Sequence, residues 1–91
     1  MQQSSELMTT SAVLPAAVDL HARPAGVVVR EASRFVADIV IAINGKRANG
    51  KSILEVLALG ATGGTELGLT ASGDDAADAI ATLSELIPQL A

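Results

Sequence analysis

Residues 38 to 49 restrict the fold of this chain more than any other stretch. The segment from Asp38 to Ile43 has isoleucine at alternate positions and is rich in β-branched side chains, which is typical of a strand with one buried face. Asn44-Gly45 follows, and this pair is a preferred two-residue hairpin turn because both residues accept a positive φ. A short return strand is expected over residues 46–49. The chain is therefore predicted to contain an antiparallel hairpin near its middle.

Regular patterns on either side of the hairpin predict further elements. Apolar residues alternate over residues 8–14 and again over 66–71, so each segment is expected to be a strand. Helical spacing of apolar residues predicts one helix over 22–35 and a last helix that begins after Asp75. Pro88 is expected to end or bend the last helix, because proline lacks the N–H group that helical hydrogen bonds require.

A short third helix is predicted between the hairpin and the strand at 66–71. Ser52 and Glu55, three residues apart, are the pair of a capping box, so this helix is expected to start at Ser52 and stop before Gly60. The resulting element order is βαββαβα. Mixed strands and helices with one tight hairpin indicate an α+β fold, a two-layer sandwich in which helices cover one face of a mainly antiparallel sheet.

The composition limits both the core and the chemistry of the chain. Ninety-one residues suffice for one small domain, and with Phe35 as the single aromatic residue the core must consist of Ile, Leu, Val and Ala. The lack of cysteine excludes a disulfide framework and a thiolate site, and no metal or cofactor is expected. No apolar run approaches the roughly 20 residues that span a bilayer, so membrane insertion is not expected. Residues 1–7 lack signal-peptide features and are predicted to be a disordered extension of a cytoplasmic domain over residues 8–91.

Charge is distributed unevenly along the chain. The net charge of −4 and the near absence of aromatic residues argue against a nucleic-acid partner. Residues 23–51 hold all six basic residues and only two acidic ones, a net of +4, while eight acidic residues lie outside this basic segment. The six are Arg23, Arg30, Arg34, Lys46, Arg47 and Lys51. The basic segment is expected to attract acidic protein partners, and the alternative is that the helix and hairpin surfaces simply happen to be basic.

The only histidine of the chain lies in the segment Leu20-His21-Ala22-Arg23-Pro24. The predicted helix would put His21 at a helix N-terminus, where free N–H groups and the positive end of the helix dipole attract anions. Arg23 adds a cation two positions from the imidazole, and Pro24 is tolerated in the first turn of a helix. These groups together describe a phosphoryl-accepting site. The plain alternative is a capping or surface histidine.

Several motifs of the chain occur in the order and spacing of a known family. They are, in chain order, Leu20-His21-Ala22-Arg23-Pro24-Ala25, Asn44-Gly45-Lys46, Lys51-Ser52-Ile53 followed by Leu59-Gly60, and Ala71-Ser72-Gly73. Residues 8 to about 90 thus resemble HPr, the histidine-containing phosphocarrier family of the bacterial phosphoenolpyruvate:sugar phosphotransferase system. The resemblance implies an open-faced sandwich of four antiparallel strands with three helices on one face. It also implies a monomeric carrier, not an enzyme, that accepts a phosphoryl group from enzyme I and donates it to enzyme IIA domains.

The same resemblance implies roles for single residues. His21 would carry the phosphoryl group on Nδ1, with Arg23 as its electrostatic partner and Ala22 and Pro24 at the helix N-terminus that receives the phosphate. Ser52 matches a serine that an ATP-dependent kinase, HPr kinase/phosphorylase, modifies in some members. The residues expected to dock partner proteins are Ile53, Leu54, Leu57, Arg30 and Lys51. At least one of the three apolar docking residues is also expected to lie in the core.

Two features before the histidine modify these expectations. The family usually has a small polar residue and a glycine where this chain has Val18-Asp19. A carboxylate two residues from His21 is expected to favour the protonated imidazole and to oppose an arriving anion. Pro15 is expected to end the first strand early.

Two alternative functions remain open from the sequence. A paralogue of the same fold could serve a nitrogen-type or regulatory branch, or a dihydroxyacetone-kinase phosphorelay, with the histidine chemistry unchanged. A non-covalent regulatory binding module would use the exposed apolar helix alone. The intact His21-Ala22-Arg23-Pro24 segment disfavours the binding module.

Overall fold

The computed structural model of the chain describes residues 7–91, and its elements follow the predicted order. They are β1 (Leu7–Val13), α1 (Ala22–Ala32), β2 (Asp38–Ile43), β3 (Lys46–Asn49), α2 (Ile53–Ala58), β4 (Glu66–Ser72) and α3 (Ala76–Leu86), followed by a 3-10 turn at Ile87–Gln89. The disorder predicted for residues 1–7 concerns residues outside this description, except at Leu7. There the prediction is wrong, because Leu7 pairs with Ser72 as the first residue of β1.

β4 and β2 form the centre of a four-stranded sheet. The strand order is β1-β4-β2-β3, and every neighbouring pair is antiparallel. The register sets Ala12 of β1 opposite Leu67 of β4, and Ile41 of β2 opposite Leu69 of β4, so these side chains share one face. This arrangement confirms the predicted α+β fold with its antiparallel sheet.

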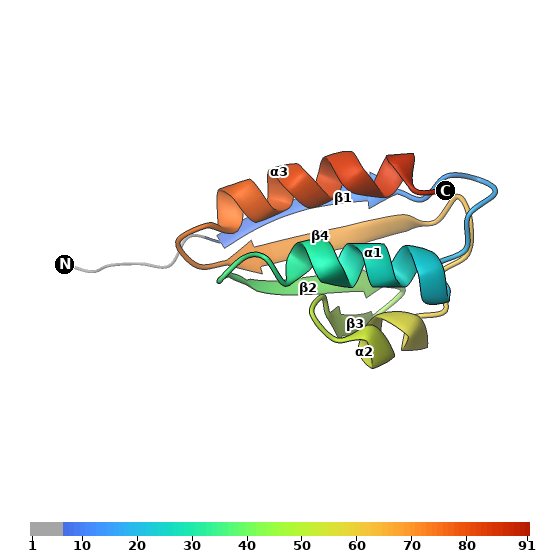
Figure 1. The fold of residues 1–91 in the computed structure, drawn as a ribbon, viewed down its shortest axis with the longest axis horizontal. Helices are drawn as coiled ribbons and strands as arrows, with labels where there is room; N and C mark the ends of the chain where they lie inside the picture. Colours follow the sequence, from blue (N-terminus) through green and yellow to red (C-terminus); the bar gives the residue numbers. More distant parts are fainter. Residues whose placement is uncertain (1–6) are drawn as a thin grey trace.

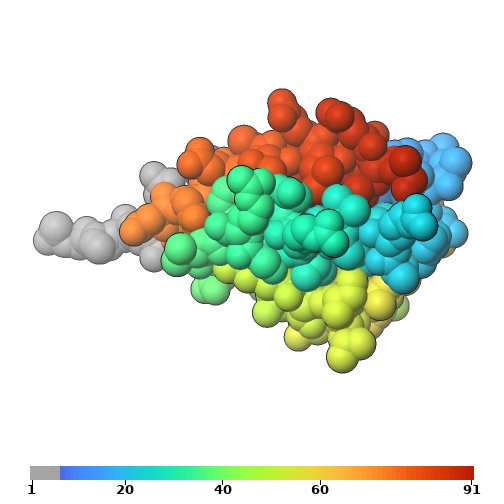
Figure 2. All heavy atoms as spheres, in the orientation of Figure 1, coloured from blue at the N-terminus to red at the C-terminus, as the bar shows by residue number. Residues whose placement is uncertain are grey.

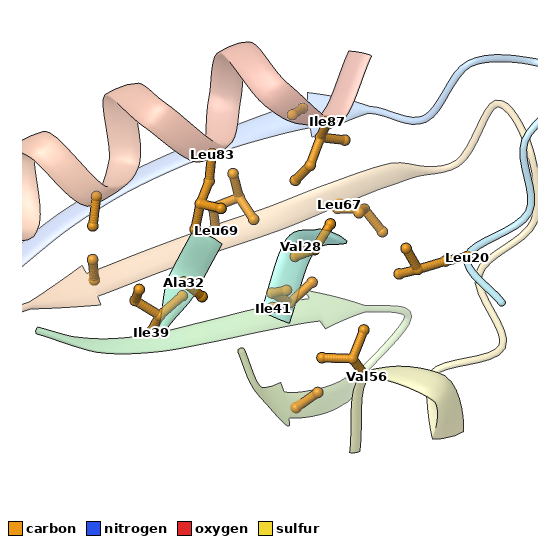
Figure 3. Packing of buried hydrophobic residues seen from close by; sticks show 14 of the residues in the cluster. Leu20, Val28, Ala32, Ile39, Ile41, Val56, Leu67, Leu69, Leu83 and Ile87 are labelled. Atoms are coloured by element: carbon orange, nitrogen blue, oxygen red, sulfur yellow. The ribbon is translucent and has the colours of Figure 1, made fainter. Parts of the chain in front are cut away.

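The helices cover one face of the sheet and leave the other face open (Figure 1). α3 lies over β1 and β4, whereas α2 packs against β3 and the side of α1. The core lies between the two layers. Figure 3 shows Val28 of α1 and Leu83 of α3 pointing toward the sheet residues Ile41 and Leu69, and all four side chains are fully buried. The buried core contains only Ala, Val, Leu and Ile, as predicted, and Phe35 packs partly buried at its edge.

The predicted hairpin is present with the predicted turn. β2 and β3 pair with Ile43 opposite Lys46, which leaves Asn44 and Gly45 as the two loop residues. Both have a positive φ, 46° and 80° respectively, as a type I′ turn requires. The residues at the turn therefore determine the register of this edge of the sheet.

α1 ends at Ala32, earlier than the predicted end at residue 35. The N–H groups of Arg34 and Phe35 donate to carbonyls three residues back, the tighter pattern of a helix end. The next two N–H groups, of Val36 and Ala37, donate to the carboxylate of Asp75 at 2.9 and 2.8 Å. A side chain from the start of α3 therefore stabilises the turn that ends α1. The apolar spacing extends past this end because Phe35 still packs against the core.

α2 has the predicted bounds, but the capping box is only half formed. Ser52 is the N-cap, and its Oγ accepts a hydrogen bond from the N–H of Glu55 at 3.2 Å. The carboxylate of Glu55 accepts from the N–H of Asn49 at 2.8 Å, instead of from Ser52 as a complete capping box requires. Gly60 follows the helix with a φ of 64°, which is the conformation that ends many helices. Glu55 therefore joins α2 to the end of β3.

The last helix agrees with its predicted apolar face. The residues at the predicted positions are all buried: Ala76, Ile80, Leu83, Ile87 and Leu90. The regular helix ends at Leu86, and Pro88 lies in the 3-10 turn that follows, which confirms the predicted end. β1 likewise ends at Val13, before Pro15, as expected.

Candidate phosphoryl-accepting site

His21 is the N-cap residue of α1. Its backbone is extended, with φ −100° and ψ −161°, and its side chain is exposed and makes no capping hydrogen bond. The first helical hydrogen bond runs from the N–H of Ala25 to the carbonyl of His21 at 2.9 Å. The N–H groups of Ala22 and Arg23 precede that bond, so they have no partner within the helix. Two main-chain donors and the positive end of the dipole therefore lie beside the imidazole.

The other predicted residues of this site lie in the first turn of α1. Arg23 is exposed, one residue into the helix from Ala22. Pro24 and Ala25 are buried against the core, which fixes the start of the helix to the body of the domain. The structure therefore brings together His21, Ala22, Arg23 and Pro24 at one helix end, as the sequence predicts. Such an end combines a nucleophilic nitrogen with groups that stabilise a phosphate.

The loop that carries His21 is attached to the segment 61–65. Leu20 is buried, and Figure 3 shows its side chain pointing from this loop toward the core. The N–H of Leu20 donates to the carbonyl of Ala61 at 2.9 Å. At the other end of the loop, the N–H of Leu14 donates to the carbonyl of Thr65 at 2.9 Å. His21 therefore projects from a loop that is held at both ends.

Asp19 makes a contact that the sequence pattern does not indicate. Its Oδ1 accepts a hydrogen bond from the N–H of Gly63 at 2.8 Å. The Asp19 carboxylate is thus hydrogen-bonded to the segment 61–65. The two residues are 44 positions apart, so no local signal connects them.

The predicted docking residues of α2 are mostly exposed. Leu54 is 76% exposed and Ile53 is 38% exposed, whereas Leu57 is partly buried and packs against the core. None of the three is fully buried, so the expectation that one belongs to the core is wrong in that form. Val56, between them, is the residue of α2 that is completely buried. We refer to Ile53, Leu54 and Leu57 as the α2 surface.

Arg30 and Lys51 differ in their availability to a partner. Arg30 is exposed in the last turn of α1, which packs beside α2. Lys51 is partly buried, and its ammonium donates to the carbonyl of Phe35 at 2.6 Å. The charge of Lys51 is therefore bound to the turn after α1. The hydroxyl of Ser52, next in the chain, is occupied as the N-cap of α2.

The turn after α1 also controls the ionisation of Asp75. The hydrogen bond from the N–H of Val36 is the largest cause that lowers the pKa of the Asp75 carboxyl from its ordinary value, and burial opposes it in part. The N–H of Ala37 and the positive charge of Lys51 lower the pKa further. The sequence does not indicate these hydrogen bonds of Asp75, because Asp75 is 39 residues from Val36.

A shallow hollow of about 340 Å³ lies elsewhere in the fold, at the open edge formed by β2, β3 and the start of α2. Its charged lining residues are Asp38, Arg47 and Glu55, and none of the residues of the α1 N-terminus lines it. The imidazole thus stands on the surface outside this hollow. Among residues 7–91, no three His, Asp or Glu side chains gather to hold a metal ion. Over the same residues, no helix has the length and apolar character needed to cross a bilayer.

The fold and this helix end define a class of small α+β sandwich proteins with an exposed histidine at a helix N-terminus. The family model described as "PTS HPr component phosphorylation site" matches residues 8–89. The chain therefore belongs to the HPr family, the phosphocarrier proteins of the phosphotransferase system. Members of this family carry phosphoryl groups and are not themselves catalysts.

Individual relatives support the same assignment. The phosphocarrier protein HPr of Mycoplasma capricolum subsp. capricolum is 44% identical over 75 residues, which cover 82% of this chain and 84% of that protein. The crystal structure of HPr from Bacillus anthracis str. Ames superimposes with a TM-score of 0.84 at 34% identity, covering 89% of this chain and 96% of that one. Crh, a catabolite repression protein of Bacillus subtilis that crystallised as a swapped dimer, gives a TM-score of 0.73 at 33% identity over 100% and 97% of the two chains.

Proposed function

We propose that this chain accepts a phosphoryl group on Nδ1 of His21 from phosphorylated enzyme I and donates it to enzyme IIA domains of the sugar phosphotransferase system. The observation that carries the proposal is the exposed imidazole of His21 at the N-cap of α1, beside the unpaired first N–H groups of that helix. Family membership supplies the phosphocarrier role.

Phosphoryl transfer to His21 requires mainly that the protein position the imidazole and compensate the negative charge of the phosphate. Phosphoryl transfer passes through a loose transition state, so the acceptor needs correct placement and compensation of negative charge more than a proton shuttle. Neutral imidazole supplies the electron pair that forms the new P–N bond, while the bond between phosphorus and the donor breaks. The N–H groups of Ala22 and Arg23 and the Arg23 guanidinium are suited to bind the oxygens of the transferred group.

The partner proteins are proposed to dock on the α2 surface together with Arg30. Leu54 and Ile53 are large apolar side chains that lie exposed next to each other in the chain, as an apolar docking surface requires. α2 packs beside α1, whose N-terminus carries His21. A partner bound there would contact the α2 surface and the imidazole at the same time.

The proposal is tested by reconstituting both transfer steps. The chain is incubated with phosphoenolpyruvate and enzyme I, freed of the donor, and then mixed with an enzyme IIA domain. We expect acid-labile phosphate on the wild-type chain, its passage to the IIA domain, and neither event with His21→Ala. Equal phosphorylation of His21→Ala would contradict the proposal. Charging only by a nitrogen-type donor or within a dihydroxyacetone-kinase system would favour the paralogue instead.

A regulatory role at Ser52 is a second candidate, favoured by the similarity to Crh and by the position of Ser52 as the N-cap of α2. A phosphate on Oγ would place about two negative charges next to the α2 surface and would displace the hydrogen bond from Glu55. The test is incubation with ATP and an HPr kinase/phosphorylase, with Ser52→Ala as the control. Absence of phosphoserine in the wild-type chain by mass spectrometry would exclude this regulation.

The cellular setting follows from the proposed partners. We propose a cytoplasmic protein, because enzyme I and the IIA domains are expected there, and a monomer, because a single chain buries a continuous apolar core. The swapped dimer of Crh makes the oligomeric state worth measuring. Sedimentation of the chain at working concentration distinguishes a monomer from a dimer.

A further inference from the structure

We propose that Asp19 is a positioning residue for His21, acting through its hydrogen bond to Gly63. This inference rests on the proposed function, because it concerns the efficiency of phosphoryl transfer to His21. Asp19 would hold the loop that presents the imidazole, and its effect as a nearby negative charge would be secondary. The opposite expectation, that the carboxylate opposes the arriving phosphate, is the alternative to be tested.

The contact joins two loops that meet backbone to backbone. A Cβ atom added to Gly63 would lie 2.1 Å from the carbonyl oxygen of Ala16, so only glycine allows this approach. The N–H of the next residue, Gly64, donates to the carbonyls of Leu14 and Pro15 at 3.1 and 3.3 Å. The N–H of Gly63 has Oδ1 of Asp19 as its acceptor, at 2.8 Å. Asp19 therefore completes the hydrogen bonding at the closest approach of the loops.

A short path of contacts connects this point to the imidazole. The carbonyl of Asp19 accepts a hydrogen bond from the N–H of His21 at 2.9 Å. Between them, Leu20 is buried and bonded to Ala61. Asp19 thus ties both its side chain and its main chain to groups that determine where residues 20 and 21 lie. Loss of the hydrogen bond between Asp19 and Gly63 would increase the mobility of the loop before His21, while Leu20 would stay buried and bonded to Ala61.

The expected consequence is kinetic. Phosphoryl transfer is sensitive to the placement of the acceptor, and a misplacement of about 1 Å can cost up to about 100-fold in rate. The carboxylate is a charge-assisted acceptor of the Gly63 N–H, but a neutral amide oxygen at the same place can also accept that bond. Substitutions of Asp19 can therefore distinguish the effect of its hydrogen bond to Gly63 from the effect of its negative charge.

The experiment compares Asp19→Ala, Asp19→Asn and Asp19→Glu for phosphoryl transfer from enzyme I, with kcat and KM measured separately. Asp19→Ala loses the acceptor, and Asp19→Glu keeps the charge but displaces it by one methylene. We expect kcat to fall about tenfold in both with KM little changed, whereas Asp19→Asn restores most of the wild-type kcat. Asp78→Ala, which removes an exposed charge from the first turn of α3, serves as the matched control. Figure 1 shows that α3 starts at the opposite end of the domain from the start of α1.

The outcomes separate the two roles. If charge dominates, Asp19→Asn and Asp19→Ala both transfer faster than wild type and Asp19→Glu resembles wild type, which would overturn the proposal. Equal kcat in all four chains would overturn it as well. Amide hydrogen exchange at Gly63 gives a readout independent of activity, and we expect faster exchange in Asp19→Ala than in Asp19→Asn. A wild-type chain that enzyme I does not phosphorylate would refute the proposed function, while unchanged Gly63 exchange in Asp19→Ala would refute only the positioning role.

Discussion

Among residues 7–91, four charged side chains make hydrogen bonds to main-chain groups of other segments. Asp19 bonds to Gly63, Asp75 to residues 36 and 37, Lys51 to Phe35, and Glu55 to Asn49. Gly63, Val36, Ala37 and Phe35 lie in turns outside helices and sheet ladders, whereas Asn49 is the last residue of β3. A hydrogen bond to a charged group generally contributes more to stability than a hydrogen bond between two neutral groups. Single residues therefore determine how the turns around the α1 helix are arranged.

The first prediction concerns the role of Arg23 in binding the transferred phosphoryl group. Arg23→Ala removes the one cation in the first turn of α1, so we expect kcat/KM for phosphorylation by enzyme I to fall about 10-fold or more, the value of one charge-assisted hydrogen bond. Arg34→Ala is the control, because Arg34 pairs with Glu31 at the far end of the helix. Steady-state kinetics give the comparison. Similar losses in both variants would contradict a specific role for Arg23.

At Asp75 the prediction concerns stability against pH. Its pKa is lowered in the folded chain, mainly by the hydrogen bond from Val36. The stabilisation is therefore fully present above the unfolded pKa of about 3.9 and is lost as the pH falls through the lower folded value. We expect Asp75→Ala to be less stable than wild type at neutral pH, with the difference shrinking toward pH of about 2. Urea unfolding across this range, with Asp74→Ala as the control, measures it, and a constant difference would contradict this role of the Asp75 hydrogen bonds.

At the scale of elements, the sequence predicts a helix or strand boundary correctly when the residues that determine it are close to it in the chain. The hairpin was predictable because Asn44 and Gly45 carry their own φ preferences, and the strands because alternation records which face is buried. The end of α1 was not predictable, since it is stabilised by Asp75 from 38 and 39 residues away. The placement of His21 at a helix N-terminus could be predicted. The attachment of its loop through Asp19 could not.

α2 is the element that we propose to dock partner proteins. Leu54→Ser is expected to raise the KM for enzyme I by about tenfold while leaving the free energy of unfolding within about 0.5 kcal/mol, because a side chain 76% exposed contributes little to the core. Val36→Ser is the matched control, since Val36 is 85% exposed in the turn after α1. Equal KM values for Leu54→Ser and Val36→Ser would show that α2 is not the docking element.

At the scale of the whole molecule, basic and acidic residues belong to different elements. Residues 23–51 contain most of α1 together with β2 and β3, and Figure 2 shows residues 20–60 over the middle and lower part of the surface in this view and α3 over its upper part. All six basic residues lie on α1, on β3 or in the turns that follow them, whereas the charged residues of α3 and of the segment before it are all acidic. Charge is therefore distributed unevenly between the elements of the fold.

This charge asymmetry predicts the salt dependence of partner binding. The association rate constant with enzyme I is expected to fall about tenfold between low ionic strength and about 0.5 M salt, with a smaller change in dissociation. Arg30→Ala should lower the low-salt association rate, and Glu85→Ala, in α3, should not. Stopped-flow binding gives both constants. An association rate independent of salt would show that the basic segment plays no part in steering.

The most direct test of phosphorylation on Nδ1 of His21 is the long-range proton–nitrogen NMR spectrum of the imidazole before and after addition of phosphoenolpyruvate and a trace of enzyme I. Because His21 is the only histidine, the spectrum contains a single imidazole and needs no assignment. We expect the Nδ1 resonance to shift and to couple to phosphorus, and both effects to disappear as the phosphoryl group is lost in acid. Phosphate incorporated while the imidazole resonances stay unchanged, or phosphorus coupling at Nε2 alone, would contradict phosphorylation on Nδ1.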